Sequence, residues 1–359
     1  MTRSATLKLA GYSLCLIIPL LAPSSIALRL PWLAPVVVFG VLPVLGLIIG
    51  EDRSLPLIGL RRSRMLVDYL EILPRIYGLL WIGILTWAAV YAARFYLSLD
   101  QFAALTLTVG IASAVALCTA HELMHRRSVV DVLLARVMTA LCFYSHMSVE
   151  HMHHHANIGD PIVGATAVRG MSVYRFAFQD YLQGLNNVWV VETARLRRSR
   201  QGWWHNHLLQ DYAMGLALAA TFYRLLGVAG LILFIGQAVF AVFVFEVITY
   251  VHHYGLVRKE DEEAGPEHAW AHHCWITNCV TFNNTFHSDH HLRPRTPYYE
   301  LHAMYGAPHL PASYFTMFCV ALVPKLWFAL MDARLEAFIQ ARDVANGELS
   351  ELGQAQRCR

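Results

Sequence analysis

Histidines at short helical spacings are the residues of this sequence best suited to chemistry. Eight of them make up three groups in which each histidine stands three or four residues from another of its group: His121, His125, His151, His154, His155, His287, His290 and His291. On a helix this spacing places the imidazoles on one face, where they can converge on a metal ion. All 19 histidines lie between positions 121 and 309, and the first 120 residues contain none. Histidines scattered as ordinary core or surface residues would not cluster in this way.

Eight imidazoles are more than one ion needs. A zinc ion in its usual sites takes four ligands, so eight nitrogen donors indicate two ions of higher coordination number. Imidazole ligation without thiolates suits iron, copper, zinc or nickel, and room for an exchangeable position favours non-haem iron that handles dioxygen. The seven cysteines include no Cys-x-x-Cys, so we expect neither a zinc ribbon nor a fused rubredoxin domain.

The rest of the chain has to bring these histidines together, and its composition indicates an integral membrane protein. Of its 359 residues, 56% are hydrophobic and only 15% are charged, and the mean hydropathy is +0.42. A soluble globular domain is normally richer in charge and less apolar. The net charge of +3 is small and the basic residues are dispersed, so we expect no nucleic-acid partner.

Long apolar runs predict an all-α protein with about six transmembrane helices. The predicted spans cover residues 9–28, 33–49, 76–97, 102–120, 208–225 and 231–251. The first two follow each other so closely that a retained helical hairpin is favoured over a cleaved signal peptide. Two further apolar stretches, 129–144 and 314–330, are too short or too interrupted to span, and we expect them at the membrane interface or in a cap.

The loop after the second predicted span is rich in arginine: Arg61, Arg62, Arg64 and Arg75. An excess of positive charge marks cytoplasmic loops. This orientation puts both chain termini and all the histidine groups on the cytoplasmic side of a bacterial-type inner membrane. There we expect a histidine-rich metal cap made of residues 121–206 and 252–335, within a single domain that covers residues 1–359.

Several segments, in order along nearly the whole chain, make it resemble the membrane-bound alkane 1-monooxygenases. It is more distantly similar to the xylene monooxygenase hydroxylase subunits and the fatty acid desaturases. The matching segments are Gly50-Glu51-Asp52-Arg53-Ser54, His121-Glu122-Leu123-Met124-His125, Glu150-His151, His154-His155, His253-Tyr254-Gly255-Leu256, His287-Ser288-Asp289-His290-His291, Val323-Pro324-Lys325-Leu326-Trp327 and Met331-Asp332. The resemblance implies six membrane helices and a histidine-held di-iron centre at the cytoplasmic face.

The resemblance also implies a reaction and adds one ligand. His253, before Tyr-Gly, joins the eight histidines and gives nine expected ligands for two iron ions, whereas His252 is not expected to bind metal. The implied reaction uses O2 to hydroxylate a terminal or benzylic C–H bond of an alkane or alkyl-aromatic hydrocarbon that enters from the bilayer. Electrons are expected from a separate rubredoxin or a ferredoxin-type reductase. The second histidine group has a shorter spacing than typical alkane hydroxylases, which leaves the substrate open.

Charged residues near these histidines suggest supporting roles. We expect four carboxylates to accept imidazole N–H bonds and so orient the ligands: Glu122, Glu150, Asp160 and Asp289. The basic run from Arg195 to Arg200 is expected to dock an acidic electron donor. Reversing its charges would then slow electron delivery and leave bound iron in place.

Other functions stay open at this point. A fatty acyl desaturase or hydroxylase of the same fold is the nearest, because the same centre could remove two hydrogens. His121-Glu122-Leu123-Met124-His125 also fits the zinc protease signature, with Glu122 as general base, but this leaves the other histidines unexplained. A metal transporter would need polar ligands at the membrane midplane, which the predicted spans lack.

Overall fold

The computed structural model describes residues 3–52, 63–259 and 262–357, and it describes side chains for 6–52, 63–259 and 262–344. These residues are almost all helical or in loops, and they form no β-strand beyond two isolated bridges, Glu51 with Cys274 and Ala271 with His309. The predicted all-α membrane fold is therefore confirmed. Arg53 and Ser54 of one matching segment, and Arg61 and Arg62 of the basic loop, lie outside the described residues.

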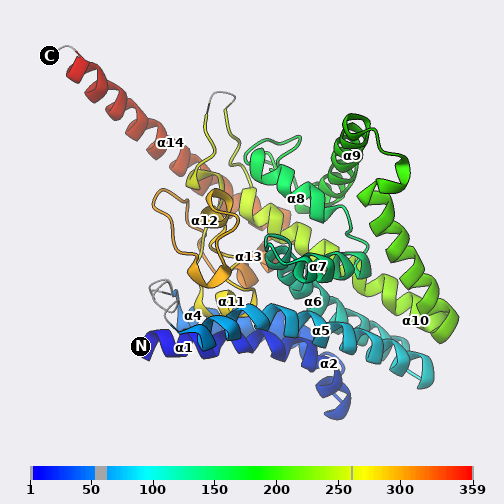
Figure 1. Ribbon diagram of the computed structural model, residues 1–359. Coiled ribbons are helices and arrows are strands. Elements are labelled where there is room, and N and C mark those ends of the chain that lie inside the picture. The colour runs from blue at the N-terminus through cyan, green and yellow to red at the C-terminus, as the bar shows by residue number, and fades with distance from the viewer. Residues whose placement is uncertain (1–2, 53–62, 260–261, 358–359) are drawn as a thin grey trace.

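The helices follow one another through short connections (Figure 1). In chain order they are α1 (Arg3–Gly11), η1 (Tyr12–Leu16), α2 (Ile17–Ala27), α3 (Leu33–Val36), η2 (Val37–Val41), α4 (Leu42–Ile49), α5 (Arg64–Arg94), α6 (Leu99–Met124), α7 (Val129–Leu141), α8 (Met147–Ala156), α9 (Val173–Ser199), η4 (Trp203–His205), α10 (His207–His253), η5 (Pro266–His268), α11 (Trp275–Val280), α12 (His287–Leu292), η6 (Tyr298–Glu300), α13 (Tyr314–Ala321) and α14 (Pro324–Arg357).

Among the described residues, four helices are long and apolar enough to cross a membrane: Thr6–Ala27, Arg64–Arg94, Leu99–Met124 and His207–His253. The prediction of six separate spans is not confirmed. The predicted span 33–49 is an apolar helical stretch of residues Leu33–Ile49, which is shorter than the four others. The predicted spans 208–225 and 231–251 both belong to α10.

The reason lies in how α10 is built. It runs for 47 residues, and only Gly227 departs from helical geometry, with φ of 68°. Glycine takes this left-handed conformation at little cost, so the helix bends there without an intervening loop. Figure 1 shows the two arms of α10 meeting at the right and the second arm returning towards the centre of the molecule. The interruption of the apolar run near position 227 therefore predicts two separate spans, whereas the structure has one helix that bends at Gly227.

The central helix is α6, which packs against α5 and α10. It starts at a capping box, in which the Ser98 hydroxyl accepts from the Gln101 backbone N–H and the Gln101 side chain accepts from the Ser98 N–H. Buried polar contacts fix its register: Trp81 of α5 donates to the Ser113 hydroxyl at 2.9 Å, and that hydroxyl donates to Gln237 of α10 at 2.5 Å. Two of the helices that carry histidines are therefore held against each other.

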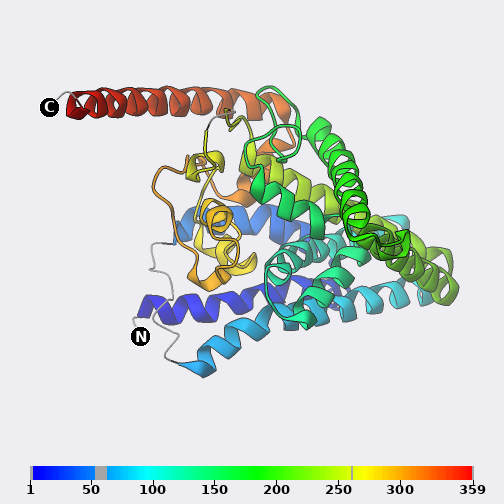
Figure 2. The same ribbon diagram turned by 45° about the horizontal axis from the view of Figure 1, so that its top comes forward.

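Two further long helices, α9 and α14, and several short ones form the rest of the molecule. The residues after α10 fold into a group that includes α11 and α12, and Figures 1 and 2 both place this group beside α8. The predicted interruption at Pro324 separates α13, which ends at Ala321, from α14, which begins at that proline. From there α14 extends away from the other helices (Figure 2).

Candidate metal centre

Helix ends deliver the nine histidines that the sequence singled out. His121 lies near the end of α6, and His125 is the residue that caps it. His253 is the last residue of α10. The other six come from two short helices: His151, His154 and His155 from α8, and His287, His290 and His291 from α12. Segments more than a hundred residues apart in the sequence therefore meet at one place.

The nine imidazoles form two groups, and within each group the candidate ligand atoms lie within 4.8 Å of one another. The first group is His121, His125, His151, His155 and His290. The second group is His154, His253, His287 and His291. Each pair at a spacing of four residues stays within one group, while the third histidine of α8 and of α12 enters the other. The triplet spacing thus lets two short helices each contribute to both groups.

The nitrogen atoms of these groups fit metal ions. His151 Nε2 lies 2.7 Å from His121 Nε2 and 2.8 Å from His155 Nε2. A neutral imidazole nitrogen carries either one proton or one lone pair, so it cannot satisfy both neighbours by hydrogen bonding. The buried Nε2 atoms of His125 and His253 have no hydrogen-bond partner among the described residues. Buried polar atoms are rarely left in this state, and a cation at the centre of each group would satisfy them.

Burial keeps these imidazoles neutral, which is the form that binds metal. Burial, with smaller contributions from His155 and Arg295, lowers the pKa of His125 to about 3. Burial also lowers the pKa of His155 to about 4, although a hydrogen bond to the His291 backbone opposes this. Burial and the neighbouring imidazoles lower the pKa of His151, His154 and His290 well below the usual value. The lone pairs are therefore available at neutral pH.

Two histidines of the second group are oriented by backbone carbonyls. His154 Nδ1 donates to the Gly164 carbonyl at 2.9 Å, and His253 Nδ1 donates to the His268 carbonyl at 2.9 Å. Since a carbonyl only accepts, the proton of each ring must sit on Nδ1. The Nε2 lone pair then faces the other imidazoles, as outer partners of metal-binding histidines normally ensure.

Comparison with known proteins agrees with this geometry. A fatty acid desaturase family model matches residues 100–321, which contain every histidine of both groups. Alkane 1-monooxygenase 1 of Pseudomonas aeruginosa is 32% identical over 317 residues, 84% of this chain and 82% of the relative. The chain belongs to the alkane 1-monooxygenase family. Alkane 1-monooxygenase 2 of Alcanivorax borkumensis is 29% identical over 89% of this chain and 85% of its own length.

A relative whose name gives a different substrate has a similar sequence identity to this chain. The xylene/toluene monooxygenase hydroxylase component XylM of Pseudomonas putida is 32% identical over 273 residues, 74% of this chain and 72% of its own length. As a member of the alkane 1-monooxygenase family, the chain is a membrane-bound oxidoreductase of the monooxygenase class. Its histidine groups are compatible with the metal binding of that family.

The carboxylates predicted to orient the ligands of this monooxygenase have other partners. Asp289, fully buried, accepts from the Arg293 guanidinium at 2.7 Å. Glu122 accepts from Arg126 at 3.2 Å, and Asp160 accepts backbone N–H bonds of its own turn. In these contacts the acids bond to groups of their own segments, whereas backbone carbonyls accept the hydrogen bonds of the His154 and His253 rings. Closeness in sequence to a histidine therefore did not predict which group orients its ring.

Glu150 belongs to an acidic cluster beside the histidines, whose other members, Asp180 and Glu246, were not predicted from the sequence. Glu150 and Asp180 line a cavity that also touches the metal groups, and burial raises the pKa of Glu150 to about 8 and of Asp180 to about 6. Glu246 lies next to Asp180 and accepts a hydrogen bond from the Tyr144 hydroxyl at 2.7 Å. An available signal was Glu246 itself, because an acid inside an apolar helical run is usually functional.

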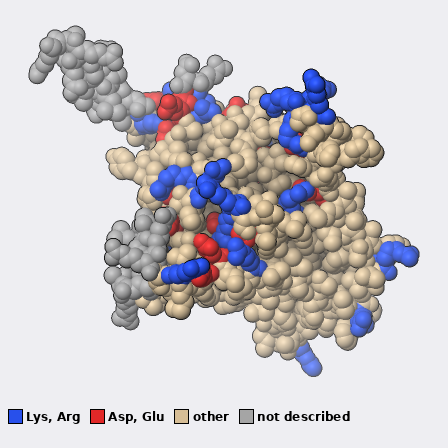
Figure 3. Space-filling model, viewed as in Figure 1, with Lys and Arg blue, Asp and Glu red and all other residues tan. Residues whose placement is uncertain are grey.

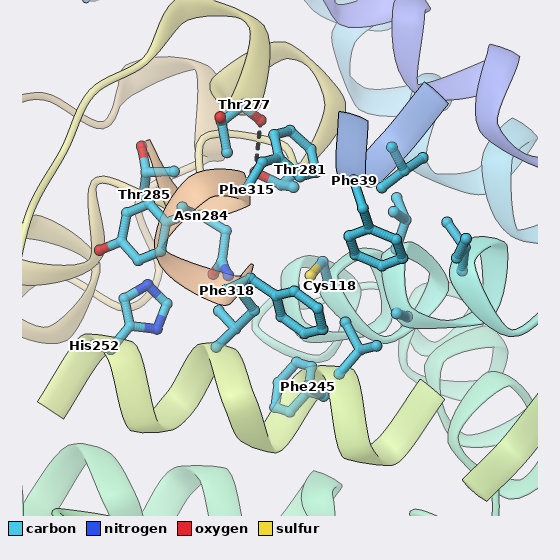
Figure 4. Close-up of a pocket in the computed structure, with 17 residues that line it drawn as sticks. Phe39, Cys118, Phe245, His252, Thr277, Thr281, Asn284, Thr285, Phe315 and Phe318 are labelled. Carbon is cyan, nitrogen blue, oxygen red and sulfur yellow. Dashed lines mark hydrogen bonds between the residues drawn. The ribbon is translucent and has the colours of Figure 1, made fainter. Parts of the chain in front are cut away.

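A second cavity extends from this one and is almost entirely apolar. Its walls come from α6, from the second arm of α10, from α13 and from the region of η2. Figure 4 shows His252 at one end of the cavity and Phe39 at the other. The Phe39 ring stacks on Phe318 at 5.0 Å. In a monooxygenase of this family, a cavity of this kind suits an apolar substrate.

Proposed function

We propose that the chain is a membrane-bound di-iron monooxygenase that hydroxylates a terminal or benzylic C–H bond of a hydrophobic hydrocarbon. Both substrates named for its relatives, alkanes and alkyl-aromatics, fall within this class. The observation that carries the proposal is the pair of buried groups made only of imidazoles, next to an apolar cavity. The nine predicted histidines are the proposed ligands, and iron is the proposed metal because nitrogen-rich sites with open positions suit dioxygen chemistry.

The ligand number argues against the zinc protease. A protease zinc site uses three protein ligands and a water molecule, whereas His121 and His125 share their group with three further histidines. Glu122, which would act as the base, is bound to Arg126. Desaturation by the same centre remains the alternative, supported by the fatty acid desaturase model that matches residues 100–321.

The protein residues would bind, orient and dehydrate the reactants. Bound iron would supply the activation of O2. In the overall reaction one oxygen atom enters the C–H bond and the other leaves as water, with two electrons and two protons supplied from outside. The apolar cavity walls would take up the hydrocarbon and exclude water, and they end at His252, whose ring stacks on His287 at 3.9 Å. A substrate carbon at that end lies next to the second histidine group.

The electron donor is proposed to be a separate rubredoxin or a ferredoxin-type reductase, and the substrate is proposed to enter from the lipid. We also propose that residues 1–359 form one domain in a bacterial inner membrane, with the cap of residues 121–206 and 252–335 and both termini in the cytoplasm. Labelling of single cysteines placed in the cap and in the turn near Ser98 would test this orientation.

Product analysis tests the reaction. Membranes containing the chain, a rubredoxin and its reductase are given octane, hexadecane, toluene or p-xylene, and the products are identified. A primary or benzylic alcohol supports the proposal. An alkene supports desaturation, and absence of any oxidised product with full iron loading contradicts both.

A further inference from the structure

Two polar side chains lie where the apolar cavity meets the cavity beside the metal groups. Four residues line both cavities: Phe245, Ile248, His252 and Asn284. Two of them are apolar and continue the cavity wall. His252 and Asn284 are therefore the two polar residues that border both cavities.

His252 is held in place but has an unused nitrogen. Its side chain is buried, with 3% of the residue exposed, and no described residue forms a hydrogen bond with its Nε2 atom. The ring stacks on that of His287, with 3.9 Å between the ring centres, and the centre of the Tyr314 ring lies 4.8 Å away. It belongs to neither metal group among the described residues. A buried imidazole nitrogen without a partner costs free energy, so a ligand that bonds to it would be favoured.

Asn284 lies at the same end of the cavity as His252. It belongs to the loop between α11 and α12, and Figure 4 shows its side chain near the His252 ring. Its amide offers both a donor and an acceptor. The neighbouring hydroxyls of Thr281 and Thr285 already donate to Thr277 and Asn278. Thr277 lines only the apolar cavity.

We propose that His252 and Asn284 form a polar collar that binds the oxygen atom of the newly formed alcohol. This inference rests on the proposed function. An alcohol hydroxyl both donates and accepts, so it matches either tautomer of His252 and either end of the Asn284 amide. The hydrocarbon has no atom that can form a hydrogen bond with the collar, whereas the alcohol product has a hydroxyl group that can. The collar thus distinguishes product from substrate at the carbon that reacts.

The collar predicts product-specific binding that can be measured with 1-octanol and octane. The variants are His252→Phe, which keeps a ring to stack on His287, and Asn284→Leu, which is not adjacent to a proposed ligand. For each variant, inhibition by 1-octanol should weaken by roughly 2- to 10-fold, the usual worth of one hydrogen bond. The KM for octane should change by a smaller factor than the inhibition by 1-octanol, and iron content should not change.

Ile248→Val is the matched control, because Ile248 lines the same junction without a polar group. It should shift the KM for octane and the inhibition by 1-octanol together. Parallel shifts in the collar variants would show a steric role only and would overturn the proposal. Unchanged inhibition by 1-octanol in Asn284→Leu and in His252→Phe, with full iron content, would also overturn it.

Calorimetric titration of the iron-loaded, detergent-solubilised protein with 1-octanol separates the collar from the proposed function. It measures alcohol binding without turnover. Weaker alcohol binding in the variants supports the collar even if the wild-type chain hydroxylates no hydrocarbon, in which case the proposed function alone fails. If His252→Phe loses iron, Asn284→Leu and His252→Gln decide the question, and equal alcohol binding in both and in wild type contradicts the collar.

Discussion

Lys8 and Asp52 form an ion pair with 2.7 Å between Nζ and the carboxylate, and only 1% and 2% of their side chains are exposed. The pair joins the start of the first membrane helix to the residues that follow α4. The Asp52 backbone N–H also donates to the His273 carbonyl at 2.6 Å. This hydrogen bond links the ion pair to the segment between α10 and α11. The Lys8 ammonium also lies 5.5 Å from the centre of the Phe286 ring. Phe286 directly precedes the proposed ligand His287.

This relationship predicts a large cost for breaking the pair. Lys8→Met leaves the Asp52 carboxylate buried without its cation, and loss of one partner of a buried pair typically costs about 3–5 kcal/mol. The double variant Lys8→Met/Asp52→Asn should recover part of this loss. The measurement is thermal unfolding in detergent, with Arg64→Met, at an exposed pair with Asp68, as the control that changes little. A double variant less stable than Lys8→Met would contradict the prediction.

The two metal groups predict which histidines hold iron. His151→Gln removes a ligand from the first group, and His291→Gln removes one from the second. Each should lower the iron content and reduce activity by more than the roughly 10- to 100-fold that loss of an outer partner costs. His153→Gln is the matched control, because His153 lies on α8 beside them but in neither group. Iron loss in His153→Gln equal to that in His151→Gln would refute the assignment.

The stacked rings of Phe39 and Phe318 predict how long a substrate the cavity accepts. Phe39→Ala removes the ring at the far end from His252 and should admit longer chains. Because one methylene in an apolar pocket is worth about 1–3 kcal/mol, kcat/KM for hexadecane relative to octane should rise by roughly tenfold or more. Leu47→Ala, an exposed position elsewhere on the first hairpin, should leave this ratio unchanged. A ratio that does not move in Phe39→Ala would rule out this end of the cavity as the limit.

Figure 3 shows basic side chains gathered in two places on one face, over the region of α12 and at the far end of α9. At α9, Arg195 of the predicted docking run is bound to Glu192 at 2.8 Å. Near α12, Arg127 and Arg295 line an open cavity that reaches His125, and the described residues give neither an acidic partner.

We therefore expect an acidic donor to dock mainly at the second surface. Arg127→Glu/Arg295→Glu should raise the KM for a reduced rubredoxin several-fold and weaken its salt dependence, with iron content unchanged. Arg197→Glu/Arg198→Glu tests the docking run predicted from the sequence. A larger effect in that pair would return the docking site to α9.

The sequence predicted which histidines meet in space better than it predicted the architecture that brings them together. The spacing of His151, His154 and His155 pointed to one of the helices whose imidazoles converge, because ligands need fixed offsets that a sequence displays. It could not show that the middle histidine of each triplet, His154 or His290, enters the other group, since this depends on how α8 and α12 pack. The bend at Gly227 and the contact between Lys8 and Asp52 were equally hidden, because both depend on segments distant in the chain.

The positions of His252 and Asp180 could not be predicted from the sequence either. Neither has the spacing of a ligand, and Asp180 stands in a polar helix where a solvated charge is the usual expectation. Only the packing of α9 and α10 against the histidine groups places Asp180 beside Glu246 and His252 between two cavities.

Counting metal atoms tests the central claim most directly. The full chain is purified from membranes of iron-supplied cells, and iron and zinc per chain are measured by mass spectrometry of the digested protein. Two iron atoms per chain, with zinc at trace level, is the result expected from two groups of five and four imidazoles. One zinc atom per chain, or no metal in protein that is folded and fully helical, would contradict the claim.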